Sequence, residues 1–327
     1  MTPKLPSPSF LPQPPVGKIP APPLYPRHRD GVLKIARDWY TPSRVRVDGH
    51  AIAQLPVGTI TPPPAGETNL ESSLAVPLHE ASEFAIAMGA INHRFWSLDE
   101  AGRFVRYAHD GQVGAWAMSQ AFEKAWADAN SPIRCARDRG LALTPAAIRQ
   151  VFGDIPDLQG RAEILNEILL SDRLAHLARE SERMASAGER FSTGFAAALA
   201  DAFPQGYADE VLKKAQLATS AIWRSAVGRG YESPEPELTA FADYQIPRVL
   251  CAMGLLEYAP DLVETIAAYR PIAPDSLDER ALRAASILAI EQLAMAQGVG
   301  VADVDYWVWL QRKVPTDPFH LTLTTAY

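Results

Sequence analysis

The segment ELTAFADYQIPRVLCAMGLLEY, residues 237–258, places an acidic loop directly before an apolar run. Proline is tolerated in the first turn of a helix, because its missing N–H has no partner there. Pro247 therefore predicts the start of a helix, and the apolar residues 249–256 predict that this helix is buried. The residues just before Pro247 then form the loop that enters the helix.

Asp243 is the candidate catalytic group of this loop, and it lies between the aromatic residues Phe241 and Tyr244. A carboxylate surrounded by aromatic side chains can acquire a raised pKa or stabilise a positive charge that develops in a reaction. The alternative is that Asp243 only caps the following helix, which is a common role for an acid at such a position. The residues alone leave both interpretations open.

Composition and charge exclude several classes of protein. With 327 residues the chain can bury a sizeable core, as one large domain or two small ones. The net charge of −7 argues against a large nucleic-acid footprint, which needs a basic face, but allows a single nucleotide as ligand. Cys135 and Cys251 have no CxxC partner, which argues against a disulfide framework or a zinc–thiolate site. No apolar run is long enough to span a membrane and no secretory signal is visible, so we expect a cytoplasmic protein.

The start of the chain is dominated by proline, with ten prolines in residues 1–26. Each proline fixes φ and removes a hydrogen-bond donor. Residues 1–28 are therefore predicted to form an extended tail, with a proline-rich docking ligand as the alternative. Residues 29–327 are predicted to form a single, mainly helical domain.

Helical periodicity covers most of that domain. Besides the helix at Pro247, the predicted helices are residues 31–40, 78–88, 115–128, a helix that opens at Thr144, 158–182, 191–203, 210–227, 260–269 and 277–296. A small β-hairpin is predicted at residues 105–111, because Gly111 supplies the positive φ that its turn requires. Residues 318–327 are predicted to be an edge strand or an extended tail. The sequence contains no glycine-rich phosphate loop and no GxSxG elbow, so it does not predict a nucleotide-binding α/β fold.

The segment INHRFW, residues 91–96, combines hydrogen-bonding side chains with two aromatic ones. Such a set can form a flat pocket wall on which a ring stacks. The alternative is an ordinary turn whose Phe95 and Trp96 belong to the core, because large aromatic residues dominate cores. His93 is not predicted to be a metal ligand, because no second histidine lies three or four residues away.

FADYQIPRVL, residues 241–250, belongs to a series of short segments in a fixed order. The others are Ile91-Asn92 with Phe95-Trp96, Ala215-Gln216 with Trp223, Glu279 with Arg283 and Glu291, DYWVW at residues 305–309, and Pro318-Phe319-His320 through Tyr327. This ordered set resembles the queuosine salvage protein family, over about residues 82–327.

The resemblance implies an all-helical fold related to helix-hairpin-helix DNA glycosylases. It also implies hydrolysis of the N-glycosidic bond of queuosine 5′-phosphate, with release of the base queuine for salvage. No metal and no organic cofactor are implied, and the partner is a small nucleotide or nucleoside rather than a nucleic-acid polymer. The oligomeric state is not indicated.

The implied chemistry assigns roles to particular residues. Cleavage of an N-glycosidic bond passes through an oxocarbenium-like sugar, which a fixed carboxylate can stabilise while it orients water. Asp243 is the predicted catalytic residue. The predicted substrate-binding residues are Asn92, His93, Arg94, Phe95, Trp96, Phe241, Tyr244, Arg283, Asp305, His320 and Tyr327. Among these, Phe95, Trp96 and Tyr244 are expected to stack on the base, and His320 to meet a phosphate or sugar hydroxyl. For Arg283 the alternative to phosphate binding is a structural salt bridge with a nearby glutamate.

The chain departs from the family at five positions that look polar and pocket-like: Gly89, His93, Ala221, Gln245 and Ala281. Where this chain has Gly89, Ala221 and Ala281, the family has an acid. It has phenylalanine in place of His93 and arginine in place of Gln245. Two alternatives therefore remain beside the implied reaction. One is a divergent enzyme of the same fold that acts on another nucleoside-like substrate, and the other is a base- or nucleotide-binding protein without catalytic activity.

Overall fold

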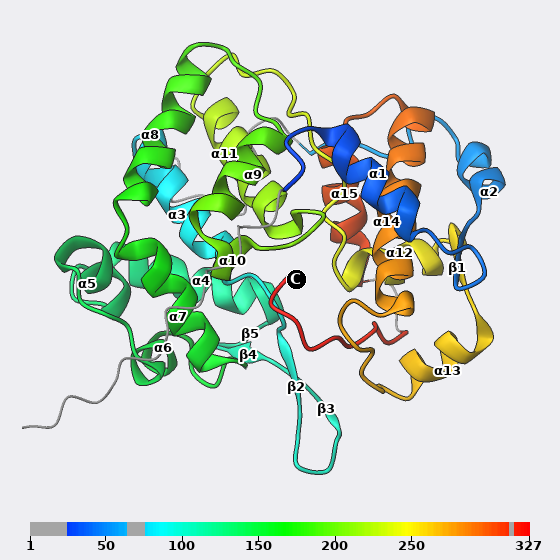
Figure 1. The fold of residues 1–327 in the computed structure, drawn as a ribbon, viewed down its shortest axis with the longest axis horizontal. Coiled ribbons are helices and arrows are strands. Elements are labelled where there is room, and N and C mark those ends of the chain that lie inside the picture. The colour runs from blue at the N-terminus through cyan, green and yellow to red at the C-terminus, as the bar shows by residue number, and fades with distance from the viewer. Residues whose placement is uncertain (1–24, 64–75, 314–316) are drawn as a thin grey trace, which may run out of the picture.

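The computed structural model describes residues 25–63, 76–313 and 317–327, and these residues fold mainly into helices (Figure 1). The strands among them pair into short two-stranded antiparallel sheets. The mainly helical fold class is therefore confirmed. The relation to helix-hairpin-helix DNA glycosylases and the single-domain organisation stay predictions.

The helices are α1 (Arg29–Trp39), α2 (Gly49–Gln54), α3 (Leu78–Ala90), α4 (Gly114–Ala127), α5 (Pro132–Arg139), α6 (Pro145–Phe152), α7 (Leu158–Leu169), α8 (Asp172–Ser186), α9 (Thr193–Ala202), α10 (Pro204–Tyr207), α11 (Lys213–Gly228), α12 (Gln245–Ala252), α13 (Pro260–Ala267), α14 (Leu277–Gln297), α15 (Val301–Leu310) and the 3₁₀ turn η2 (Gln311–Lys313). The strands are β1 (Val45–Val47), β2 (Trp96–Leu98), β3 (Phe104–Arg106), β4 (Ala108–His109), β5 (Gln112–Val113) and β6 (Leu256–Tyr258).

Most buried apolar side chains belong to two clusters, which divide the helices into two lobes. The first lobe holds α3 to α11, and the second holds α1, α2 and α12 to α15. Figure 1 shows the lobes side by side, with the C-terminal segment running between them. The central helix of the second lobe is α14, which is buried along most of its length. Burial of these apolar faces is the main driving force for the fold.

The helix that follows Asp243 is shorter than predicted. It begins at Gln245, which places Pro247 in its first turn as expected, but it ends at Ala252 rather than continuing to residue 256. Gly254 has a φ of +73°, and the N–H of Leu255 donates to the carbonyl of Leu250. Glycine in this conformation closes a helix C-terminus. The chain then continues as β6, which pairs with β1.

The predicted helix at residues 158–182 is two helices, so the prediction of one long helix is wrong. α7 ends at Leu169 and α8 begins at Asp172. The Ser171 side chain accepts a hydrogen bond from the N–H of Arg173, at 3.2 Å, which makes Ser171 the N-cap of α8. A serine N-cap stabilises a new helix start, and it interrupts an apolar stripe that reads as continuous.

The hairpin turn predicted at Gly111 is confirmed, but its strands differ from the prediction. Asp110 and Gly111 have φ values of +47° and +75°, and they join β4 to β5. Residues 105 and 106 instead belong to β3, which pairs with β2 in a hairpin that projects from the body in Figure 1. Of the predicted tail, residues 1–24 lie outside the described residues, and Tyr25 is buried. The C-terminal segment is extended, which agrees with the prediction of an extended tail rather than an edge strand. Thr322 forms an isolated β-bridge with Ile272.

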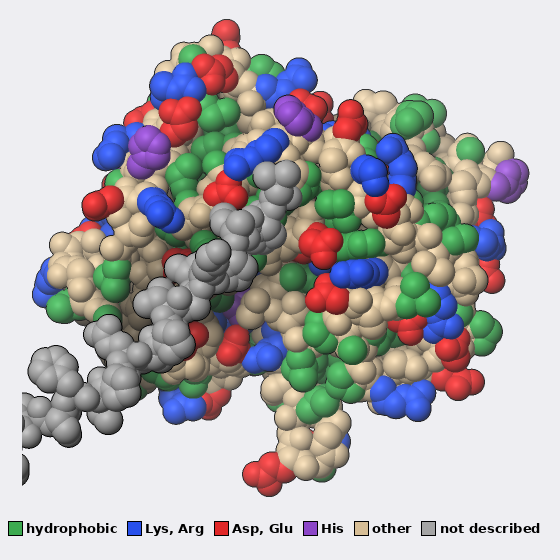
Figure 2. Space-filling view, in the orientation of Figure 1, with side chains coloured by type: hydrophobic (Ala, Val, Ile, Leu, Met, Phe, Trp, Pro, Cys, Tyr) green, Lys and Arg blue, Asp and Glu red, His purple; other side chains and the backbone are tan. Residues whose placement is uncertain are grey.

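Acidic and basic side chains are interspersed on the face shown in Figure 2. That face therefore carries no broad basic surface of the kind that a nucleic-acid polymer needs. Among the helices that the structure describes, none is by itself long and apolar enough to cross a membrane. α14 and the α15–η2 segment pass that test only as a pair bent by 109°.

Candidate active site

Asp243 lies at the N-terminus of α12 and is half-buried. Its Oδ1 accepts hydrogen bonds from the N–H groups of Gln245, at 2.6 Å, and Ile246, at 3.1 Å. Asp243 therefore does cap the helix, and the helix dipole stabilises its negative charge. Because both bonds use Oδ1, the carboxylate has a fixed direction, and within the described ranges Oδ2 accepts no hydrogen bond.

The backbone that leads to Asp243 is held by two buried side chains. Gln216 on α11 accepts from the N–H of Thr239, at 2.8 Å, and donates to the Thr239 hydroxyl, at 2.9 Å. Asp305 on α15 accepts from the N–H of Phe241, at 2.8 Å. Both lobes thus contribute a contact that fixes this loop. Phe241 itself packs in a small apolar cluster with Leu238.

Two adjacent lysines at the start of α11 play different roles. Lys214 donates from Nζ to the carbonyl of Ala90, at 2.6 Å, at the C-terminal end of α3. Lys213 is also buried, but among the residues described its Nζ makes no hydrogen bond. Burial lowers the pKa of Lys213, and the carboxylates of Asp243 and Asp305 oppose that effect. Lys213 is therefore a buried amine on which the charge of Asp243 acts, and its Nζ has no hydrogen-bond partner among the described residues.

Asp305 is another buried titratable group that contacts the Asp243 loop. Burial raises its pKa to about 7, the N–H of Phe241 counteracts this, and the charge of Asp243 adds to it. The lowered pKa of Lys213 and the raised pKa of Asp305 mark a water-poor environment around the Asp243 loop. Perturbed titratable groups of this kind cluster at functional sites.

The raised pKa of Asp305 predicts how the stability of the fold depends on pH. Its folded pKa of about 7 is above the ordinary value of 3.8, so its contribution to stability is present at low pH and lost as the pH rises through about 7. We expect the unfolding free energy of the native chain, minus that of Asp305→Asn, to fall between about pH 4 and about pH 7 and to level off above that range. Urea unfolding of both proteins across this range measures the difference. A difference that stays constant or rises would contradict the prediction.

The INHRFW segment is anchored by Arg161 on α7. This buried arginine donates to the carbonyls of Ile91, of His93 at 2.5 Å and of Arg94 at 3.3 Å. Its guanidinium also lies over the ring of Phe95, 5.4 Å from the centroid. Arg161 and Lys214 together satisfy carbonyls at the C-terminal end of α3, where the helix dipole favours cations. Arg94, whose carbonyl also accepts from Arg161, has a φ of +39°.

His93 is buried in this segment, and its Nε2 lies 3.3 Å from Oδ2 of Asp157. Among the described residues its Nδ1 has no partner. Burial, followed by the charge of Arg161, holds the pKa of His93 well below its ordinary value. Asn92 and Arg94 are half-exposed, and Arg94 approaches the same carboxylate at 4.0 Å.

The predicted stacking residues lie in two different clusters. Phe95 belongs to the core of the first lobe, where its ring stacks on that of Tyr107 with centroids 6.3 Å apart. Trp96 and Tyr244 belong to a separate cluster with the C-terminal segment, in which Tyr244 contacts Phe319 with centroids 4.5 Å apart. The cluster lies beside Asp243, because Tyr244 is its neighbour in the chain. A role for these rings in binding stays a prediction.

The C-terminal segment brings His320 and Tyr327 into the interior. His320 Nε2 lies 3.3 Å from the Tyr327 hydroxyl. Burial, with the charge of Arg283 as the second cause, lowers the pKa of His320 to about 3, so His320 is neutral. Arg283 is buried and pairs with Asp209, at 2.7 Å, and with Glu279, at 3.7 Å. The structure therefore shows the salt bridge that was the alternative for Arg283, although its main partner is Asp209.

The predicted segments converge at one place. The backbone N–H of Arg94 donates to the carbonyl of Tyr327, at 3.2 Å, and Trp96 packs with Tyr244 in the same apolar cluster. The rings of Tyr244 and Tyr327 lie 6.4 Å apart. The INHRFW segment, the Asp243 loop and the C-terminal segment are thus neighbours at the junction of the two lobes.

Two of the five departures occupy helix-packing positions rather than a pocket. A Cβ at Gly89 would lie 3.1 Å from both the Cβ of Ala218 and the hydroxyl of Tyr207, so a larger side chain there requires these neighbours to move by a few tenths of an ångström. Ala281 is fully buried in the second lobe. Ala221 packs at the edge of the first-lobe core. Gln245, next to Asp243, has a buried Oε1 without a partner among the described residues.

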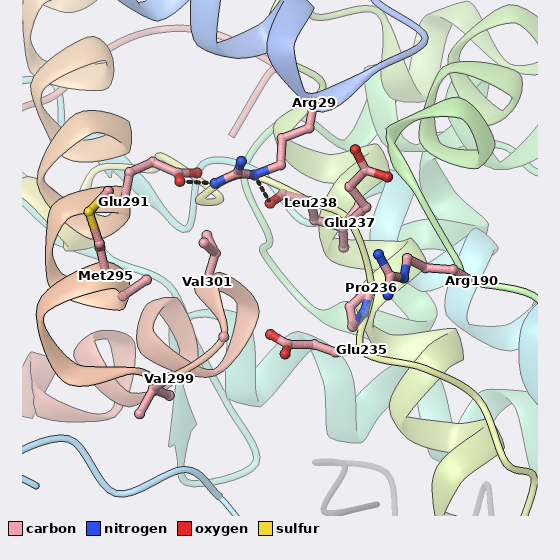
Figure 3. A pocket seen from close by; sticks show the side chains of 12 residues that line it. Arg29, Arg190, Glu235, Pro236, Glu237, Leu238, Glu291, Met295, Val299 and Val301 are labelled. Atoms are coloured by element: carbon pink, nitrogen blue, oxygen red, sulfur yellow. Dashed lines mark hydrogen bonds and ion pairs between the residues drawn. The ribbon is translucent and has the colours of Figure 1, made fainter.

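A cavity of about 390 Å³ lies at the lobe junction, in front of the residues that precede the Asp243 loop (Figure 3). Arg29 crosses it, paired with Glu291 and donating to the carbonyl of Leu238 at 3.1 Å. None of the predicted site residues lines it. Its lining is Arg29, Arg190, Glu235, Pro236, Glu237, Leu238, Glu291, Ala294, Met295, Val299, Gly300 and Val301. Over the described ranges, no group of three or more His, Cys, Asp or Glu side chains could hold a metal ion.

Comparison with known proteins connects this geometry to a family. The model of the queuosine salvage protein family matches residues 75–316. A protein of Sphaerobacter thermophilus named queuosine 5′-phosphate N-glycosylase/hydrolase is 30% identical, over 92% of this chain and 99% of its own. Proteins of the same name from Dictyostelium discoideum and Mus musculus are each 26% identical, over 58% and 62% of this chain and 65% and 64% of theirs.

Proposed function

The chain belongs to the queuosine salvage protein family, and we propose on this basis that it hydrolyses the N-glycosidic bond of queuosine 5′-phosphate and releases the free base. The base is then of the 7-deazaguanine type. The observation that carries the proposal is the fixed carboxylate of Asp243, which lies beside a buried lysine and an aromatic cluster.

The geometry of Asp243 suits this reaction. As the bond to the base breaks, positive charge develops on the sugar, and a carboxylate at a fixed position stabilises it without reorganisation. Oδ1 is occupied by the N–H groups of α12, so Oδ2 is the oxygen that faces the sugar or accepts a proton from the attacking water. The planar base can stack against the neighbouring cluster of Trp96, Tyr244 and Tyr327.

Lys213 is the proposed partner of the 5′-phosphate. It is a buried cation close to Asp243, and the other buried lysine, Lys214, already uses its Nζ on the carbonyl of Ala90. A dianionic phosphate would supply the acceptors that the Lys213 ammonium lacks among the described residues. Hydrogen bonds between charged groups are roughly twice as strong as neutral ones.

Replacement of Lys213 by methionine is expected to raise the KM for queuosine 5′-phosphate about 10- to 100-fold, because a charged hydrogen bond contributes about 1.5–3 kcal/mol. The KM for queuosine, which lacks the phosphate, should change much less. Steady-state kinetics on both substrates measure the two effects. Lys214→Met is the matched comparison, and it should lower stability without discriminating between the substrates. An equal loss for both substrates in Lys213→Met would remove Lys213 from phosphate binding.

The proposed function itself is tested by mass spectrometry of released bases. The protein is incubated with queuosine 5′-phosphate, with queuosine and with ordinary nucleotides, and Asp243→Asn serves as the control. The expected result is release of queuine from the queuosine species by the native protein, and much slower release by Asp243→Asn. Release only from an ordinary nucleotide would reassign the substrate, and release from none would contradict the enzymatic function.

A further inference from the structure

Three arginines near Asp243 have no acidic partner. Arg106 lies at the end of β3, Arg248 on α12 and Arg312 in η2. Across the described ranges, no ion pair with a carboxylate is found for any of the three, although the chain has 38 acidic residues against 31 lysines and arginines. Other described arginines, such as Arg139 and Arg270, also form no ion pair, so what sets this group apart is that Arg248 and Arg312 are at least partly buried and are joined by a hydrogen bond.

The two inner arginines are held in place. Arg248 is 9% exposed, its guanidinium lies over the ring of Phe319 at 5.8 Å, and it donates to the carbonyls of Arg312 and, at 3.2 Å, of Asp317. Its Nε has no partner among the residues described. Arg312 lies on the ring of Trp309 at 3.2 Å and donates to its carbonyl at 3.1 Å. Both guanidinium groups are therefore ordered before any ligand arrives.

Arg106 acts on Arg248, Arg248 acts on Arg312, and the charge of Asp243 acts on both Arg248 and Arg312. Burial, and after it the charge of Arg106, lower the pKa of Arg248, while Asp243 opposes this. Burial also lowers the pKa of Arg312. The charge of Asp243 opposes this effect, and the charge of Arg248 adds to it by a smaller amount. Arg106 in turn acts on Tyr244. The three arginines outnumber the two carboxylates that act on them, Asp243 and Asp317, so their mutual repulsion is relieved further when an anion binds.

We infer that Arg106, Arg248 and Arg312 form an anion-capture cluster that draws the phosphomonoester of the substrate to the Asp243 site. The inference rests on the proposed function and adds a step to it: the cluster acts on encounter, and Lys213 holds the phosphate once it is bound. A local positive field in a protein of net charge −7 concentrates anionic substrate where it is needed. Such fields raise association rates and lose their effect as salt is added.

The test compares kcat/KM for queuosine 5′-phosphate with that for queuosine, in the native protein and in the double variant Arg106→Gln/Arg312→Gln. We expect the ratio of the two values to fall about 10-fold in the variant at low salt, and the difference to shrink as NaCl rises from about 50 mM to about 300 mM. Arg312→Lys, which keeps the charge, should preserve most of the ratio. Arg179→Gln is the matched control, because Arg179 is an exposed arginine on α8 in the first lobe.

The outcomes separate the inference from the function it rests on. A ratio that stays at the native value in the double variant, or that falls equally in Arg179→Gln, overturns the capture cluster. If the native protein releases no base from either substrate, the proposed function fails instead. Calorimetric titration with ribose 5-phosphate then decides on the cluster: weaker binding in the double variant than in Arg179→Gln supports it, and equal binding overturns it.

Discussion

Asp243→Asn is expected to lower the turnover of queuosine 5′-phosphate about 100- to 1,000-fold, which is the usual effect of removing one electrostatic contact to a transition state. Asparagine keeps an oxygen that can accept from the N–H groups of Gln245 and Ile246. The cap of α12 should therefore survive while the negative charge is lost. Rates of base release under saturating substrate measure the effect, and thermal unfolding checks the fold.

A second variant separates the catalytic role of Asp243 from its capping role. Asp243→Ala removes both, so we expect it to lose turnover and also about 1 kcal/mol of stability, the typical contribution of an N-cap. If Asp243→Asn turns over near the native rate, Asp243 is only the cap of α12. That outcome would support the alternative interpretation of the sequence, in which Asp243 has no catalytic role.

Arg283→Met is expected to lower the free energy of unfolding by about 3–5 kcal/mol, because it leaves Asp209 buried without its partner. Both side chains of this pair are almost fully buried, at 3% and 4% exposure. Glu279 would lose the same cation. Urea unfolding of the native and variant proteins measures the change.

The double variant Arg283→Met/Asp209→Asn provides the control, since it removes the uncompensated charge along with the arginine. It should recover a large part of the loss. Lys34→Met, which breaks an exposed pair with Asp38, should change stability little. A loss in Arg283→Met as small as that of Lys34→Met would show that the buried network does not stabilise the fold.

The fold was largely predictable because apolar periodicity marks most helices, and the errors have local causes. Gly254 ends α12 and Ser171 separates α7 from α8, although the apolar pattern continues across both. Each is a single residue whose backbone conformation or side-chain oxygen overrides the periodicity. The pairing of β6 with β1 was not predictable either, because it joins strands about 200 residues apart.

The candidate site was only partly predictable. Asp243 was identifiable because its loop and helix are contiguous in sequence. Lys213, Asp209 and Arg161 were missed, since their roles depend on partners in distant segments such as Asp243, Arg283 and Ile91. The one signal for Lys213 was a lysine pair directly before Ala215-Gln216. Gly89 and Ala281 looked like pocket positions because the sequence does not show which face of a helix meets another helix.

The most direct test of the central claim is the fate of oxygen from water. Queuosine 5′-phosphate is incubated with the protein in water labelled with heavy oxygen, and the masses of both products are measured by mass spectrometry. Hydrolysis of the N-glycosidic bond at the Asp243 site predicts unlabelled queuine and a sugar phosphate that carries the label, with both formed about 100- to 1,000-fold more slowly by Asp243→Asn. Absence of labelled sugar phosphate from the native protein, or equal amounts from Asp243→Asn, would contradict the account.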